Sequence, residues 1–262
     1  MNRQAYPTDL NDTQWALIAP LLPKRPSIRG RPRTWSERDI LDGILYIVRG
    51  GCGWRLMPHE LPAWQTVYGY YWQWRNTGLW EQINTVLVQQ VRVRQGRKPQ
   101  PSAGIIDSQS VKTSEGGEER GVDVYKQVSG RKRHIIVDTL GLLLLVLVHR
   151  ASIPDGNGGK LLLAKLFERI KHSLYNRWCR FKLIWADGAY EDIAAWVKQY
   201  FGWQVEVVRR SPKAKGFQIL PRRWVVEIVF TQMTKTRVLP VRTGWDNVAN
   251  FDFIVGHKYT IN

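Results

Sequence analysis

Three acidic residues in the second half of the chain stand where they could hold a metal ion. Asp107 and Asp187 each follow a short apolar run, and Glu227 lies in a segment with helical character. An ionised carboxylate next to buried strands is costly unless it gains a partner. Because the chain is strongly basic, we predict that this partner is a divalent metal ion that also binds a phosphate.

The chemistry that such a site favours is the cleavage of a phosphodiester. Two divalent ions roughly 3.5–4 Å apart can activate the attacking oxygen and neutralise the leaving oxygen. Mg²⁺, or Mn²⁺ in its place, takes a few carboxylate ligands and completes its shell with water and phosphate. Asp107 would bridge the two ions, and Asp187 and Glu227 would each hold one. The alternative for each residue alone is that it caps a turn.

The charge of the chain indicates a polyanionic partner. Lys and Arg exceed Asp and Glu by 39 − 22 = +17, and each cation on a phosphate releases a condensed counterion. No basic amphipathic helix is apparent, and the longest apolar run, 140–148, is about half the roughly 20 residues of a membrane span. We therefore expect a cytoplasmic protein without a membrane partner, associated with the nucleoid when it binds DNA.

The elements that must position these residues fall into two parts. Residues 1–95 read as a small all-α domain of short helices in a helix-turn-helix-like arrangement, with Asn11 and Ser36 as caps. Residues 96–102 read as a linker, and 103–262 as an α/β domain. Three strands with a turn at 139–141 predict an antiparallel meander, and the later alternation predicts parallel strands joined by helices. The predicted strands are 104–107, 133–138, 142–149, 181–186 and 204–208, and the predicted helices are 159–175, 193–201 and 222–236.

Several motifs in order give the sequence a family resemblance. The motifs are Ile106 to Thr113, Gly130 to His134, Val137 to Leu143, Ile184 to Tyr190, and Arg222 to Glu227. With them, the sequence resembles bacterial insertion-sequence transposases of the DDE type from about Leu10 to Glu227. This resemblance implies a ribonuclease H-like mixed sheet with flanking helices, and a metal-binding catalytic triad of Asp107, Asp187 and Glu227.

Basic residues near these motifs are candidates for DNA contact. Arg223 lies four residues before Glu227, where it could hold a phosphate, or form an ordinary ion pair within its helix. The 130–134 run could contact the DNA backbone or be a solvated strand end, and 29–33 could enter a minor groove. The helix at 64–75 could read DNA or pack into the core. The candidate DNA-binding residues are Arg29, Arg31, Arg33, Lys112, Arg131, Lys132, Arg133, Arg223 and Lys235.

The resemblance implies a DNA transposase that binds double-stranded DNA at terminal inverted repeats and at target sites. Since two ends must be paired, a homodimer or a larger synaptic complex is implied. Pro240, Gly244 and Gly256 interrupt the helix expected after Glu227. A catalytically inactive derivative that only binds DNA therefore remains an alternative, as does a structure-selective nuclease on the same fold.

Overall fold

The computed structural model describes residues 3–23, 34–113, 120–172, 180–209 and 223–235. They form two compact units, one up to Leu87 and one from Val88 to Thr234. The arginines of the 29–33 segment and the residues after 235 that interrupt the expected helix lie outside the described ranges.

The first unit is helical, as its apolar periodicity predicts. Asn11 and Ser36 cap their helices as predicted: each accepts a hydrogen bond from the third residue of its helix, and both caps are capping boxes. Gly51 ends the second helix with a φ of 69°, a conformation that glycine adopts without strain. The elements are α1 (Asp12–Ile18), η1 (Ala19–Leu21), α2 (Glu37–Gly50), η2 (Trp54–Leu56), α3 (Trp64–Asn76) and α4 (Leu79–Arg94), the last of which crosses into the second unit.

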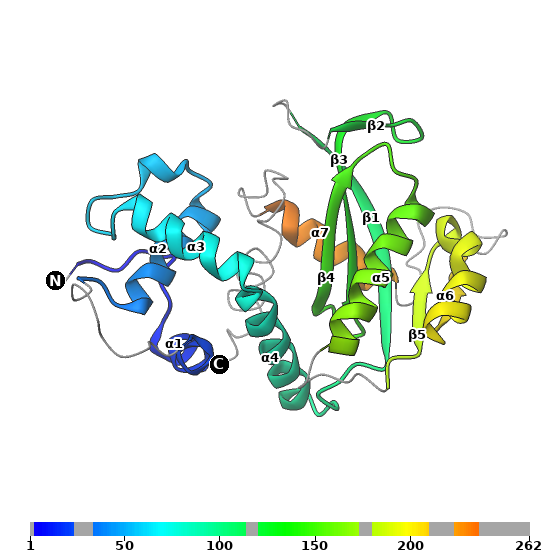
Figure 1. Ribbon diagram of the computed structural model, residues 1–262, viewed down its shortest axis with the longest axis horizontal. Coiled ribbons are helices and arrows are strands. Elements are labelled where there is room, and N and C mark those ends of the chain that lie inside the picture. The colour runs from blue at the N-terminus through cyan, green and yellow to red at the C-terminus, as the bar shows by residue number, and fades with distance from the viewer. Residues whose placement is uncertain (1–2, 24–33, 114–119, 173–179, 210–222, 236–262) are drawn as a thin grey trace. The chain divides into compact units, whose positions relative to one another are not determined.

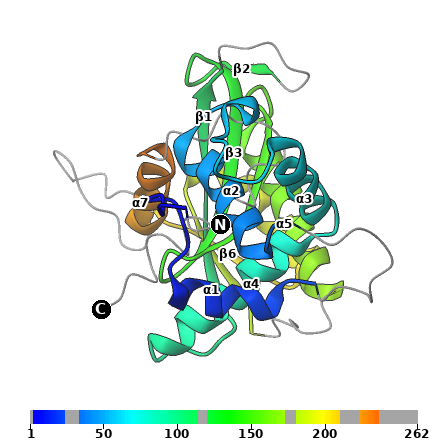
Figure 2. The same cartoon turned by 90° about the vertical axis from the view of Figure 1, so that its left-hand side faces the viewer.

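The helices α2 and α3 pack closely side by side (Figures 1 and 2). A Cβ added to Gly43 would lie 3.1 Å from Val67. The glycine in α2 therefore allows α3 to approach α2 closely at this point. The connection between the two helices, residues 51–63, is much longer than the tight turn of a helix-turn-helix. A short connection, Thr77 and Gly78, joins α3 to α4.

The second unit is built on a six-stranded mixed sheet in the order β2-β3-β1-β5-β6, with β4 also paired to β3. Antiparallel β1, β3 and β4 form the predicted meander, and β5 and β6 run parallel to β1, as predicted. The strands are β1 (Ala103–Lys112), β2 (Gly121–Asp123), β3 (Val128–Asp138), β4 (Leu143–Arg150), β5 (Leu183–Ala186) and β6 (Gln204–Val207). The fold is mixed α/β and consistent with a ribonuclease H-like domain.

Helices cover both faces of this sheet (Figure 1). On one face, the imidazole of His134 in β3 reaches the backbone of Asp155 at the start of α5, at 3.1 Å. On the other, Asp107 in β1 faces Arg223 in α7. Since successive side chains of a strand point to opposite faces, α5 and α7 lie on opposite sides. The elements are α5 (Asp155–His172), η3 (Gly188–Ile193), α6 (Ala194–Phe201) and α7 (Arg223–Lys235).

The β3–β4 turn is held by Asp138. Its carboxylate accepts hydrogen bonds from the backbone of Leu140 and Leu142, at 2.9 and 2.8 Å, and pairs with Arg92 of α4. Gly141 takes a φ of 73°, which the tight turn requires. The predicted turn at 139–141 is therefore confirmed, and the buried carboxylate of Asp138 is fully paired.

The prediction that the first strand ends at Asp107 is wrong. Strand β1 continues to Lys112, so Asp107 lies in its middle. The polar residues Ser108 and Ser110 suggested a loop, but they pair with His134 and Lys132 of β3 across the ladder. Strand β3 likewise begins at Val128 rather than at residue 133, and the short β2 was not predicted.

Candidate active site

Asp107 is anchored in the interior of the sheet. Strand β1 is paired on both sides, with β3 and with β5. One carboxylate oxygen of Asp107 accepts a hydrogen bond from the backbone N–H of Ser108 at 2.6 Å. Its side chain is only 15% exposed. Burial, together with the neighbouring charge of Asp187, raises the pKa of Asp107 to about 6.

Asp187 is brought beside Asp107 by the strand register. In the parallel pair, Ile105 of β1 lies opposite Trp185 of β5, and each aspartate stands two residues further on. Both side chains therefore leave the same end of the β1–β5 pair. Asp187 ends its strand as predicted, and its Oδ1 caps η3 by accepting a hydrogen bond from Ala189 at 2.9 Å.

The guanidinium of Arg223 lies between the two aspartates. Its Nη2 is 3.7 Å from Oδ2 of Asp107 and 3.5 Å from Oδ2 of Asp187. The side chain is 18% exposed, so this charge is partly shielded from water. The alternative that Arg223 pairs only within its own helix is not what the structure shows, because its partners are Asp107 in β1 and Asp187 at the start of η3.

Glu227 lies one turn along α7 from Arg223 and is exposed. Within the described part of the chain, no three His, Cys, Asp or Glu side chains lie close enough to hold one metal ion. The structure therefore brings together Asp107, Asp187 and Arg223, and it does not bring Glu227 into the same cluster.

The two aspartates are chemically suited to a divalent cation. Their Oδ2 atoms converge on one cationic nitrogen, and each Oδ1 is held by a backbone N–H. The mutual repulsion that contributes to the raised pKa of Asp107 would be relieved by a doubly charged ion. Carboxylate oxygens are the ligands that Mg²⁺ and Mn²⁺ prefer. The residues present therefore fit such an ion.

The candidate DNA-binding residues differ in their exposure. Lys112 is exposed at the end of β1, and Arg131 is half-buried. Lys132 and Arg133 are each 3% exposed. Arg133 donates to the side chain of Gln109 on β1. Arg29, Arg31, Arg33 and the side chain of Lys235 lie outside the described part of the chain.

A buried polar network on the α5 face was not anticipated from the sequence. The ammonium of Lys132 lies 3.0 Å from Asp123 and 2.8 Å from Asp155, and it donates to the backbone of Ile153 at 3.0 Å. Ser110 also donates to Asp123, at 2.5 Å. The signal in the sequence was the recurrence of polar residues at alternate positions, Ser108, Ser110 and Lys112, which share one face of a strand.

Two histidines extend this network along β3 and β4. His134 and His149 stack with their rings 4.9 Å apart, and a ring nitrogen of each meets the other at 2.8 Å. Burial, and then the charge of His149, lowers the pKa of His134, so the ring is neutral at physiological pH. A Cβ added to Gly158 would lie only 2.4 Å from His134, so α5 packs directly on this pair.

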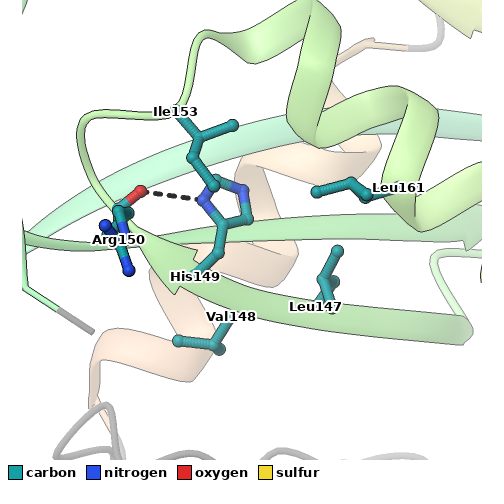
Figure 3. Close-up of a pocket in the computed structure, with 6 residues that line it drawn as sticks. All are labelled: Leu147, Val148, His149, Arg150, Ile153 and Leu161. Carbon is teal, nitrogen blue, oxygen red and sulfur yellow. Dashed lines mark hydrogen bonds between the residues drawn. The ribbon is translucent and has the colours of Figure 1, made fainter. Parts of the chain in front are cut away.

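A pocket lies on the same unit, between β4 and α5 (Figure 3). Its volume is about 610 Å³, and its lining is mostly apolar. The imidazole of His149 donates to the backbone carbonyl of its neighbour Arg150 at 2.9 Å, as Figure 3 shows. The lining contains no acidic residue. The lining residues are Leu147, Val148, His149, Arg150, Ile153 and Leu161.

Comparison with known proteins agrees with the fold. A family model described as "Transposase DDE domain" matches residues 98–255, and one described as "Putative transposase of IS4/5 family" matches residues 10–84. The chain is 29% identical over 118 residues to the uncharacterized 16.2 kDa protein of insertion element IS402 from Burkholderia cepacia. The aligned region is 43% of this chain and 78% of that protein. It is 31% identical over 81 residues to the uncharacterized protein y4sN of Sinorhizobium fredii. Here the aligned region is 31% of this chain and 64% of that protein.

The mixed sheet places Asp107 and Asp187 beside one another where the β1–β5 ladder ends. Because the DDE model matches more than half of its length, the chain belongs to the transposase DDE domain family. Domains of this family generally depend on divalent metal ions and act on DNA. The resemblance inferred from the motifs is thus confirmed, and the match continues beyond Pro240 to residue 255. No helix in the described ranges is long and apolar enough to cross a membrane.

Proposed function

We propose that the protein binds the terminal inverted repeats of an insertion sequence, cleaves DNA strands at these ends and joins them to target DNA. The observation that carries this proposal is the convergence of Asp107 and Asp187 on the guanidinium of Arg223. Two carboxylates and one guanidinium at a single point are the groups needed to hold a metal ion and a phosphate together.

Each residue of the site has a proposed role. Asp107 and Asp187 hold the metal, and Glu227 is the third ligand, supplied by α7. Two Mg²⁺ or Mn²⁺ ions, when bound, would neutralise charge on the attacking and leaving oxygens of the scissile phosphate. Arg223 holds a non-bridging phosphate oxygen, because a guanidinium can donate two parallel hydrogen bonds to a phosphate.

The proposed division of labour follows the domains expected from the sequence. Residues 1–95 bind the ends, 96–102 link the two parts, and 103–262 carry out the chemistry. Because two ends must be cut and joined together, the active form is a dimer or a larger complex on DNA. The surplus of cations, +17 in formal charge, supports a polyanionic partner.

One observation favours an alternative in which the chain binds DNA without cutting it. Glu227 is exposed and does not join the two aspartates among the described residues. A third ligand misplaced by about 1 Å can cost on the order of a hundredfold in rate. Cleavage must therefore be measured directly, and strand transfer then separates a transposase from a nuclease on the same fold.

The test is an assay of strand cleavage and strand transfer with Mg²⁺ or Mn²⁺, on labelled duplexes that carry the boundaries of the element. Wild type is compared with Asp107→Ala, Asp187→Ala and Glu227→Ala. Asp192→Ala is the matched control, because Asp192 is an exposed aspartate in η3, close in sequence to Asp187.

We expect wild type and Asp192→Ala to cut and join the ends, while the three site variants bind DNA without cutting it. A folded wild-type protein that binds the ends but cuts nothing with either metal would favour the inactive derivative. Cleavage that survives in Asp107→Ala and Asp187→Ala would refute the proposed site.

A further inference from the structure

Helix α3 of the first unit presents one continuous exposed face. The buried positions Val67, Tyr71 and Trp74 recur at helical spacing and anchor one side of the helix. The opposite side is exposed over three turns. The residues of this face are Gln65, Thr66, Tyr68, Gly69, Trp72, Gln73 and Asn76.

The chemistry of this face, which we call the α3 face, is uncharged and rich in amides. Gln65, Gln73 and Asn76 each carry a donor and an acceptor at the end of a short side chain. Tyr68 and Trp72 are 41% and 54% exposed beside them. Asn and Gln side chains match the paired donor and acceptor that adenine shows in the major groove, and apolar groups contact the thymine methyl group.

The charge around the α3 face suits DNA. The sequence contains no acidic residue between Glu60 and Glu81. Arg55 of η2 lies over the ring of Trp64 at the start of α3, 5.9 Å from its centroid, and Arg75 lies within α3. A helix face for a second protein chain is usually rich in apolar residues at its centre. Here the centre is occupied by amides and a glycine, with the aromatic residues along one margin.

Gly69 independently indicates that another surface approaches this side of α3 closely. Glycine in a helix interior is more costly than any residue except proline, so it normally has a packing reason. A Cβ added to Gly69 would meet nothing within 4 Å among the described residues outside its own stretch of helix. The packing of these described residues therefore does not require a glycine there. A surface that approaches the backbone of α3 closely from outside would need one.

We propose that the α3 face lies in the major groove of double-stranded DNA and reads the ends of the element. In this arrangement, Gln65, Gln73 and Asn76 contact base edges, and Gly69 lets the helix axis approach the floor of the groove. The inference rests on the proposed function, because it names the surface that recognises the ends. From the sequence alone, α3 could either read DNA or pack into the core. The proposal assigns DNA reading to its exposed face.

The sharpest test is Gly69→Ala in the full-length chain. The added methyl group raises helix propensity, so the melting temperature should rise while binding to the specific duplex weakens about tenfold or more. Gly50→Ala is the matched control, because Gly50 is also exposed, lies in a helix, and has nothing within 4 Å of an added Cβ. It should leave DNA binding unchanged.

The probe is a duplex selected by the wild-type protein from a library of random-sequence DNA, compared with a shuffled duplex of the same composition. Gln65→Ala and Gln73→Ala should each lose about tenfold or more on the selected duplex and little on the shuffled one.

The outcomes separate this inference from the proposed function. If wild type selects no sequence and cuts no DNA, the proposed function itself fails, and the inference fails with it. If wild type selects a sequence and all three variants bind it equally well, only the inference is overturned. Loss of self-association in Trp72→Ala, with specific DNA binding intact, would instead make the face a protein interface and overturn the inference as well.

Discussion

Asp107 is buried at an electrostatic cost, which gives a prediction at the scale of one residue. Its pKa is about 6 in the folded chain, against an ordinary value of 3.8. The folded state therefore binds more protons than the unfolded state between these values, and stability falls as the pH rises through them. At pH 7 without divalent metal, ionised Asp107 costs on the order of 2–3 kcal/mol.

We therefore expect Asp107→Asn to unfold at a higher denaturant concentration than wild type at pH 7 in the presence of a chelator. The difference should shrink towards pH 4, where Asp107 of the wild type is protonated. The same variant should not cleave DNA, since it loses a proposed ligand. A variant that is less stable than wild type at pH 7 would contradict the electrostatic cost.

Arg223 supplies the positive charge between the two aspartates, and its removal should make the site depend on metal. Arg223→Gln leaves Asp107 and Asp187 facing one another without a counterion, so the variant should be less stable than wild type in chelator. Added Mn²⁺ should raise its melting temperature by more than that of wild type, because binding to the folded state stabilises it.

The matched control is Arg209→Gln. Arg209 pairs with Glu191 at the surface, where the side chains are 65% and 57% exposed, and such pairs contribute little to stability. This control should show no metal-dependent difference from wild type. An equal response to Mn²⁺ in the two variants would remove Arg223 from the metal site.

At the scale of elements, the Lys132 network ties β2, β3 and the start of α5 together. Burial opposes the ionisation of Asp123, but hydrogen bonds from Ser110 and Lys132 lower its pKa to about 2. Lys132→Met leaves Asp123 and Asp155 without their buried cation. Breaking such a pair on one side costs about 3–5 kcal/mol, which chemical denaturation would detect.

Lys126→Met serves as the comparison. Lys126 also approaches Asp155, at 3.7 Å, but its side chain is 44% exposed. Its loss should change the free energy of unfolding by less than about 1 kcal/mol. Equal effects of the two substitutions would show that Lys132 is not the centre of the network.

The sequence predicted the elements whose faces follow a simple period. The caps at Asn11 and Ser36, the meander and the later parallel strands are confirmed because local propensity and packing agree there. The extension of β1 past Asp107 was missed because its alternating side chains are polar on both faces. The position of Glu227 was beyond prediction, since it depends on how α7 packs against the sheet and not on any local pattern.

At the scale of the whole molecule, the net charge predicts DNA binding that weakens steeply with salt. The logarithm of the association constant should fall linearly with the logarithm of salt concentration. If exposed Lys112 contacts a phosphate, Lys112→Gln should reduce the magnitude of this log–log slope by about 1, the value for one phosphate contact. Lys198→Gln, which removes an exposed charge from α6, should leave the slope unchanged, and a fluorescence anisotropy titration measures both.

The two aspartates and Glu227 are held by different kinds of support. The spacing of Asp107 and Asp187 is fixed by the ladder between β1 and β5, whereas Glu227 is carried by a helix and stays at the surface. We expect Asp107 and Asp187 to keep their spacing whether or not DNA is bound. We expect α7 to move when DNA binds, so that Glu227 joins them. Protein that is not bound to the ends of the element would then have an incomplete metal site, and it would not cleave the chromosome of its host.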